Sequence, residues 1–138
     1  MFTLTLVTPE KKLLAGKEVE EVFIPAFRGE IDILPGHAPL MTTLTTGVLR
    51  YREKGSSEVH PVAISWGYCQ VSPVGVNVLA ETAERPEEID LPRVEKSMSE
   101  AEQRLSQTDM DVELLEKTLQ KIDRARVRKE VGVLAQQN

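Results

Sequence analysis

The N-terminal part of the chain carries short apolar runs that are typical of β-strands. The runs are rich in β-branched residues, and turn signals such as Pro35-Gly36 and Lys54-Gly55 separate them. Short strands at fairly regular spacing predict a compact antiparallel β-sandwich or flattened barrel. The runs lie at residues 2–6, 19–24, 31–33, 48–49, 59–64, 68–71 and 76–79.

The apolar pattern becomes helical after Arg85. Asp90 can cap a helix that has Pro92 in its first turn. Residues 106–109 interrupt the pattern and include side chains that can cap the start of a second helix. Two amphipathic helices with a short connection predict an antiparallel hairpin, which buries little alone and needs the sandwich or a partner to pack against. The first stripe is Leu91, Val94, Met98, Ala101 and Leu105, and the second is Val112, Leu115, Leu119 and Ile122, resuming at Val131 and Leu134.

A change in composition accompanies the change in pattern. All six aromatic residues and seven of the eight glycines precede Arg85, and no proline follows Pro92. We therefore predict two domains, a β-sandwich domain at residues 1–86 and a helical hairpin domain at residues 87–138.

Composition argues against several classes of protein. A net charge of -5 argues against nucleic acid as a partner, since phosphate binding needs a basic face. The N-terminus has no cationic segment before an apolar run, and no stretch reaches the roughly twenty apolar residues of a membrane span, so we expect a soluble chain without direct membrane insertion. The lone cysteine, Cys69, lies in a predicted strand, which favours a buried apolar role and suits a reducing compartment.

One loop presents polar side chains. The prolines of Pro35-Gly36-His37-Ala38-Pro39 fix φ, and the glycine permits a turn that other residues resist. Glu30 and Asp32 precede this loop, so the segment displays two carboxylates and an imidazole. From the residues alone, a structural role is as good an interpretation of His37 as a functional one: its ring nitrogens would hydrogen-bond to nearby backbone groups of the turn.

The sequence carries no enzyme signature. No Gly-x-Ser-x-Gly, His-Glu-x-x-His, phosphate-loop or dinucleotide motif occurs. The two histidines, His37 and His60, lie far apart without other ligands at a recognisable spacing, so we expect no metal site. The sequence therefore predicts no catalytic residue, and on physical grounds alone a free-standing protein-binding module with a helical tail is possible.

Four motifs stand in a distinctive order along the chain. They are Val7-x-Pro9, the segment from Ile24-Pro25 through Gly29-Glu30 to Leu34-Pro35-Gly36-His37-Ala38-Pro39-Leu40, then Gly47-Val48-Leu49, and Val78-Leu79-Ala80-Glu81-x-Ala83. With the sandwich and the hairpin, this order resembles the epsilon subunit of F-type ATP synthases of bacteria and chloroplasts. The resemblance implies a sandwich of about ten strands that binds the gamma subunit and is seated on the ring of c subunits.

The same resemblance implies a role and a location. It implies a non-catalytic central-stalk subunit of a proton-translocating ATP synthase, peripheral at the cytoplasmic face of the bacterial inner membrane. It also implies that the helical hairpin can extend toward the alpha and beta subunits and inhibit ATP hydrolysis.

The resemblance implies a binding partner for each polar surface. Glu30, Asp32 and His37 are expected to face polar loops of the c-ring, where rim contacts contribute registration more than affinity. The basic residues that follow Lys117 are expected to contact an acidic segment of the beta subunit, although by pattern alone they are an ordinary solvated helix face. These basic residues are Lys121, Arg124, Arg126, Arg128 and Lys129.

The chain departs from the family pattern in two places. Some members bind ATP through Ile/Leu-Asp-x-x-Arg-Ala near the start of the second helix, but the aligned stretch at 110–115 has Leu114 in place of the arginine. We therefore expect no ATP binding by the hairpin and no other cofactor. A near match at 122–127 lies at a different level of the hairpin, and Asp111 is better explained by the helix dipole. Trp66 stands where the family commonly has a pair of glycines. Its ring either packs at the start of a strand or is exposed as an anchor against gamma.

Overall fold

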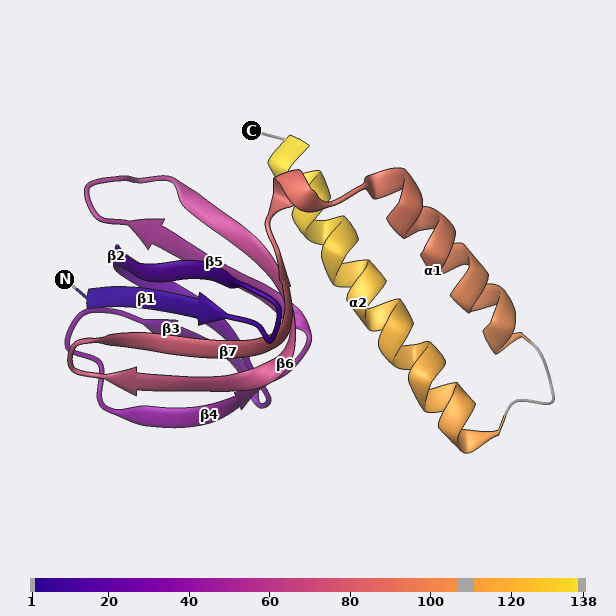
Figure 1. The fold of residues 1–138 in the computed structure, drawn as a ribbon, viewed down its shortest axis with the longest axis horizontal. Coiled ribbons are helices and arrows are strands. Elements are labelled where there is room, and N and C mark those ends of the chain that lie inside the picture. The colour runs from indigo at the N-terminus through magenta and orange to yellow at the C-terminus, as the bar shows by residue number, and fades with distance from the viewer. Residues whose placement is uncertain (1, 107–110, 137–138) are drawn as a thin grey trace.

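A curled β-sheet followed by two helices forms the structure (Figure 1). The structure is a computed structural model that describes residues 2–106 and 111–136. A short 3-10 helix, η1 (Pro86–Glu88), leads from the sheet to the helices α1 (Leu91–Leu105) and α2 (Val112–Gln136). The predicted sandwich-like sheet followed by two helices is confirmed, while the caps predicted at 107–109 lie outside the described residues. The strands of the described chain are β1 (Phe2–Val7), β2 (Lys12–Ala26), β3 (Gly29–Ile33), β4 (Leu40–Leu44), β5 (Gly47–Glu53), β6 (Val59–Ser72) and β7 (Gly75–Glu84).

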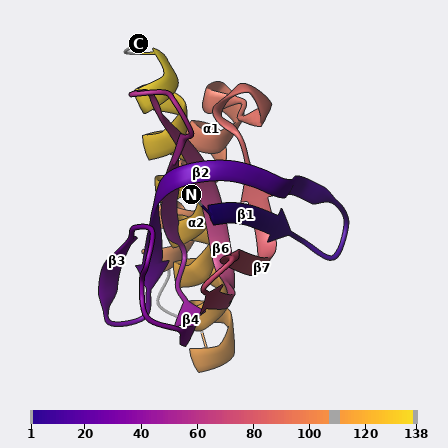
Figure 2. The same ribbon diagram turned by 90° about the vertical axis from the view of Figure 1, so that its left-hand side faces the viewer.

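The sheet closes on itself through β1. This strand pairs with β2 on one side and with β7 on the other, while β5 bridges β2 and β6. Figure 2 views the molecule from the side away from the helices and shows the strands wrapping around a common interior. The β1–β7 pair is parallel, so the prediction of an antiparallel sheet is wrong at this pair. Residues 8–74 supply the long crossover that a parallel pair requires.

The number of strands is smaller than predicted. The described residues form seven strands rather than about ten, because two long strands each serve several neighbours without a break. The first part of β2 pairs with β1, and the part beyond Val19 pairs with β5 and β3. In β6, residues 59–64 pair with β5 and residues 67–71 pair with β4. A strand that bends between partners therefore replaces two shorter ones.

Most of the interior of the sheet is filled by apolar positions that the sequence pattern picked out, and Leu14 and Leu44 join the core from outside those runs. Alternate residues of β1, namely Phe2, Leu4 and Leu6, are buried, as the strand period of two requires. Cys69 is completely buried, which confirms its apolar role. Burial raises the pKa of the Cys69 thiol to about 12, so the thiolate that reacts with oxidants is scarce at neutral pH.

The α1 helix begins where its predicted capping residue places it, and α2 begins just after Asp111. The Asp90 carboxylate accepts a hydrogen bond from the Arg93 backbone N–H at 3.2 Å, and Pro92 lies in the first turn of α1. The Asp111 carboxylate accepts from the Leu114 N–H at 2.7 Å, just before α2 starts. A carboxylate at this place also matches the positive end of the helix dipole.

The α2 helix lies between α1 and the sheet, and its N-terminal end is farther from the sheet than its C-terminal half (Figure 1). It contacts β6, β5 and η1, and its C-terminal half is the part that runs close to the strands. The predicted apolar stripe is therefore not buried at its start, where Val112, Leu115 and Leu119 are exposed. Neither helix of the described chain combines the length and apolar character that a membrane span needs.

Candidate functional site

The predicted carboxylates occupy one face of β3. Glu30 and Asp32 are two residues apart on the strand, so both side chains project to the same, exposed side. The Arg50 Nη2 atom lies 2.8 Å from Glu30 Oε1, and the Arg50 guanidinium also stacks 4.4 Å above the Phe23 ring. Glu30 is thus held in place on the sheet surface, while Asp32 is exposed.

His37 lies beyond the end of β3, in the loop that leads to β4. The loop turns at Gly36, whose φ of 86° suits glycine, and the His37 N–H donates to the Leu34 carbonyl at 3.1 Å. The His37 Nδ1 atom is 2.7 Å from the Ala38 carbonyl oxygen. Because a carbonyl only accepts, Nδ1 must carry the hydrogen, and Nε2 is left for another partner. The ring therefore hydrogen-bonds to a backbone carbonyl. His37 lies in the loop beyond β3 and not on the strand face that carries Glu30 and Asp32.

The basic residues of α2 do not share one face. The side chains of Arg124 and Arg128 lie against the sheet, where they line a small space beside Ser65 and Thr82. Arg128 pairs with Glu84 of β7 at 2.7 Å, and Lys129 lies 3.7 Å from Glu95 of α1. On the outer side of α2, Arg126 pairs with Asp123 at 2.6 Å, and Lys121 is exposed. The docked hairpin thus engages part of the predicted patch.

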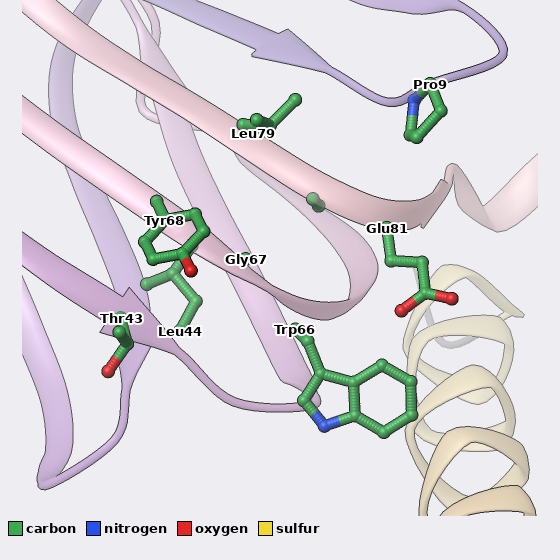
Figure 3. A pocket seen from close by; sticks show the side chains of 9 residues that line it. Pro9, Thr43, Leu44, Trp66, Gly67, Tyr68, Leu79 and Glu81 are labelled. Atoms are coloured by element: carbon green, nitrogen blue, oxygen red, sulfur yellow. The ribbon is translucent and has the colours of Figure 1, made fainter.

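An apolar groove crosses the outer face of β4, β6 and β7 (Figure 3). Its volume is about 440 Å³. Tyr68 is 60% exposed and Leu79 52% exposed, and these two residues are direct neighbours across the β6–β7 pair. A close strand contact at Gly67 forms the floor, since a Cβ there would lie 1.9 Å from the Leu79 carbonyl oxygen. The lining residues are Pro9, Thr43, Leu44, Trp66, Gly67, Tyr68, Leu79, Ala80 and Glu81.

The sequence contained a signal for this groove. Tyr68 and Leu79 alternate with the buried residues Cys69 and Val78, so the strand period assigns them to the outer face. Large apolar side chains at outward positions mark a contact surface rather than a core. Trp66, for which packing and contact were both considered, lies half-buried at the edge of this groove.

A second groove lies where η1 meets α1. Its volume is about 470 Å³, and it is lined by the linker, the first turn of α1 and Gly132 of α2. The stretch from Ile89 to Val94 in this region reads Ile-Asp-Leu-Pro-Arg-Val, which matches the ATP motif form more closely than residues 110–115 do. Its final position is Val94 in place of alanine, and Asp90 already serves as the helix cap. Met110, the first residue of the stretch considered before, lies outside the described residues.

Comparisons with known proteins agree with this architecture. A family model described as the β-sandwich domain of the ATP synthase delta/epsilon chain matches residues 1–86. The chain belongs to the ATP synthase delta/epsilon chain family. An ATP synthase epsilon chain of Bdellovibrio bacteriovorus is 56% identical over 102 residues, which are 74% of this chain and 73% of that one. One from Geobacter sulfurreducens is 42% identical over 130 residues, covering 92% of this chain and 90% of that one.

Solved structures with the same fold come from ATP synthases. A chain in the Euglena gracilis mitochondrial ATP synthase structure, described as OSCP/F1/c-ring, has a TM-score of 0.80 at 22% identity and covers 99% of this chain and 81% of that one. A chain of the Tetrahymena thermophila central stalk and c-ring has a TM-score of 0.66 at 15% identity, with 95% and 96% covered. At these identities the delta/epsilon family fold is shared, from the sheet through the hairpin.

Proposed function

We propose that this chain is a central-stalk subunit of a proton-translocating F-type ATP synthase, peripheral at the cytoplasmic face of a bacterial inner membrane. The observation that carries the proposal is the 42% identity to the Geobacter ATP synthase epsilon chain across 92% of this chain, which takes in both sheet and hairpin. The chain contributes no catalytic residue of its own. It helps couple rotation of the c-ring to the catalytic head.

The polar side of β3 and its following loop is the proposed contact with the c-ring. Glu30 is exposed and already oriented by Arg50, so little ordering is required when a partner approaches. Asp32 and the Nε2 atom of His37 offer further polar groups on the way to the loop. Exposed contacts of this kind fix registration and contribute modest affinity each.

The apolar groove on β4, β6 and β7 is the proposed contact with the gamma subunit. Met41 is 71% exposed and continues the apolar surface beside Thr43 on β4. Exposed tyrosine and tryptophan side chains at a hollow are typical of interface anchors. Trp66 then has its contact role at the groove edge, next to Tyr68.

The hairpin is the proposed regulatory element. In an extended state, its basic residues Lys121, Arg124, Arg126, Arg128 and Lys129 contact an acidic segment of the beta subunit, beside the alpha subunit, and inhibit ATP hydrolysis. The exposed Val112, Leu115 and Leu119 supply apolar surface for that state. A partner that prefers the extended hairpin shifts the population by its differential affinity.

Co-purification with the gamma subunit tests the proposed function. The full chain, tagged at its C-terminus, is expected to retain gamma from membranes of its own source. A matched variant with Tyr68 replaced by serine in the groove should retain less gamma. A chain that folds and retains no gamma would instead support a free-standing binding module, and the stalk proposal would fail.

A further inference from the structure

The foothold of the hairpin on the sheet is small. Within the described residues, α2 reaches the strands through its C-terminal half, where Arg124, Val127 and Arg128 line a small space against β6 and β7. The first turns of α2 stand away from the sheet (Figure 1). Because few apolar side chains anchor the helix, a single polar contact at the foothold carries a large share of the docking free energy.

A charged pair joins the two parts at this foothold. The Arg128 Nε atom lies 2.7 Å from Glu84 Oε1, and Nη2 donates a hydrogen bond to Glu84 Oε2 at 3.1 Å. The Nε hydrogen is buried and is not directed at an acceptor, so the hydrogen bond passes through Nη2 while Nε adds its charge. Among the described residues, no other ion pair joins α2 to a strand.

The surroundings strengthen this pair. The two side chains are 28% and 24% exposed, so water and salt screen them less than a surface pair. Ser65 is buried nearby, and its hydroxyl is already bound to that of Thr82 at 2.6 Å. These hydroxyls therefore leave the guanidinium to Glu84.

We propose that Glu84 and Arg128 form a latch that holds the hairpin on the sheet, and that Glu84 competes with the acidic partner for Arg128. The second half of this proposal rests on the proposed function, in which the same arginine contacts the beta subunit. Arg128 lies on Glu84 while the hairpin is docked and moves away from the sheet when the hairpin extends, so the latch must open before the extended contact forms. A stronger latch therefore lowers the population of the extended hairpin and weakens the inhibition of ATP hydrolysis.

The competition separates the two members of the pair. Replacing Glu84 with glutamine weakens docking but leaves Arg128 free for the partner, so inhibition of hydrolysis should deepen. Replacing Arg128 with glutamine weakens docking and also removes the extended contact, so inhibition should not deepen. A pair that merely supported the fold would not give different outcomes for its two members.

The latch itself is tested on the isolated full chain. Spin labels on cysteines placed at Asn77 of β7 and Gln120 of α2, both exposed, report docked and released hairpins by pulsed electron resonance. The native Cys69 is buried and stays unlabelled. Measurement across a series of low urea concentrations, extrapolated to none, gives the ratio of docked to released hairpin even when docking is strong.

We expect E84Q and R128Q each to lower that ratio about fivefold to tenfold, as loss of a partly buried charged hydrogen bond predicts. The double variant E84R with R128E should recover most of the loss. The control K117Q removes a charge from the same helix whose partner is Glu113 of that helix, and it should leave the ratio unchanged. Single variants within twofold of the wild type, or a double variant as released as the singles, would overturn the latch.

The docking readout involves no ATP hydrolysis. A failed latch therefore leaves the inhibition by the basic residues standing. A latch that holds while hydrolysis of the reconstituted complex is the same in E84Q and R128Q would overturn the competition, and would leave the docking pair intact.

Discussion

Replacing Tyr68 with serine removes the most exposed aromatic side chain of the apolar groove. Tyr68 is 60% exposed in the free chain. Since a tyrosine presents about 200 Å², about 120 Å² of it remains for a partner to cover. At ~25 cal/mol per Å², this area corresponds to ~3 kcal/mol of binding to gamma, or roughly a hundredfold in Kd. This is an upper bound, because association also costs side-chain entropy.

Isothermal titration of purified gamma with each variant measures the change. Val74→Ser is the matched control, because Val74 is 78% exposed but lies on the β6–β7 turn outside the groove. The sheet should survive the Tyr68 change, since a cross-strand pair contributes only about 0.2–1 kcal/mol. Circular dichroism of the variant checks that it does. Binding of Y68S within twofold of the wild type, or an equal loss in the Val74 control, would refute the assignment of the groove to gamma.

Three further predictions concern the hairpin and its linker. Titration of the isolated chain with ATP should give no tight binding, and a micromolar Kd from calorimetry would contradict the expectation. Neutralising Arg124, Arg126 and Arg128 together should relieve inhibition of ATP hydrolysis in the reconstituted complex, so unchanged hydrolysis counts against the basic contact. The Lys11 ammonium, hydrogen-bonded to Glu88, lowers the pKa of that carboxyl below its usual 4.5. The pair therefore stabilises the linker above pH 4.5, and this stabilisation is lost as the pH falls through the lowered pKa of the folded state. Because the pair is exposed, the free energy involved is less than about 1 kcal/mol. The melting temperatures of wild type and Glu88→Gln should differ near neutral pH and converge once the pH has fallen below the lowered pKa of Glu88. A difference that stays constant with pH would contradict the link.

Local chemistry made much of the fold predictable. Alternating burial in β1 follows from the strand period, and the start of α1 follows from the side chain of Asp90 and the fixed φ of Pro92. The strand count was not predictable in this way. Whether β2 bends through Val19 or stops there depends on which neighbours pair with each part, and those partners are distant in sequence.

The candidate site was predicted only in part. Glu30, Asp32 and His37 lie where the loop signals place them, but the ion pair of Glu30 with Arg50 joins residues twenty positions apart. Arg128 and Glu84 are 44 positions apart, so the pattern of α2 alone describes a basic helix and not a docked one. Long-range pairs depend on how the hairpin folds back on the sheet, which no local periodicity specifies.

ATP-driven proton pumping measures whether this chain couples the c-ring to the catalytic head. Membrane vesicles from the chain's own source are stripped of this chain and then given it back in purified form, with pumping followed by a pH-sensitive dye. If the chain is the stalk subunit that couples the c-ring to the catalytic head, pumping falls on removal and returns on addition. Pumping that is unaffected by its removal would contradict the account.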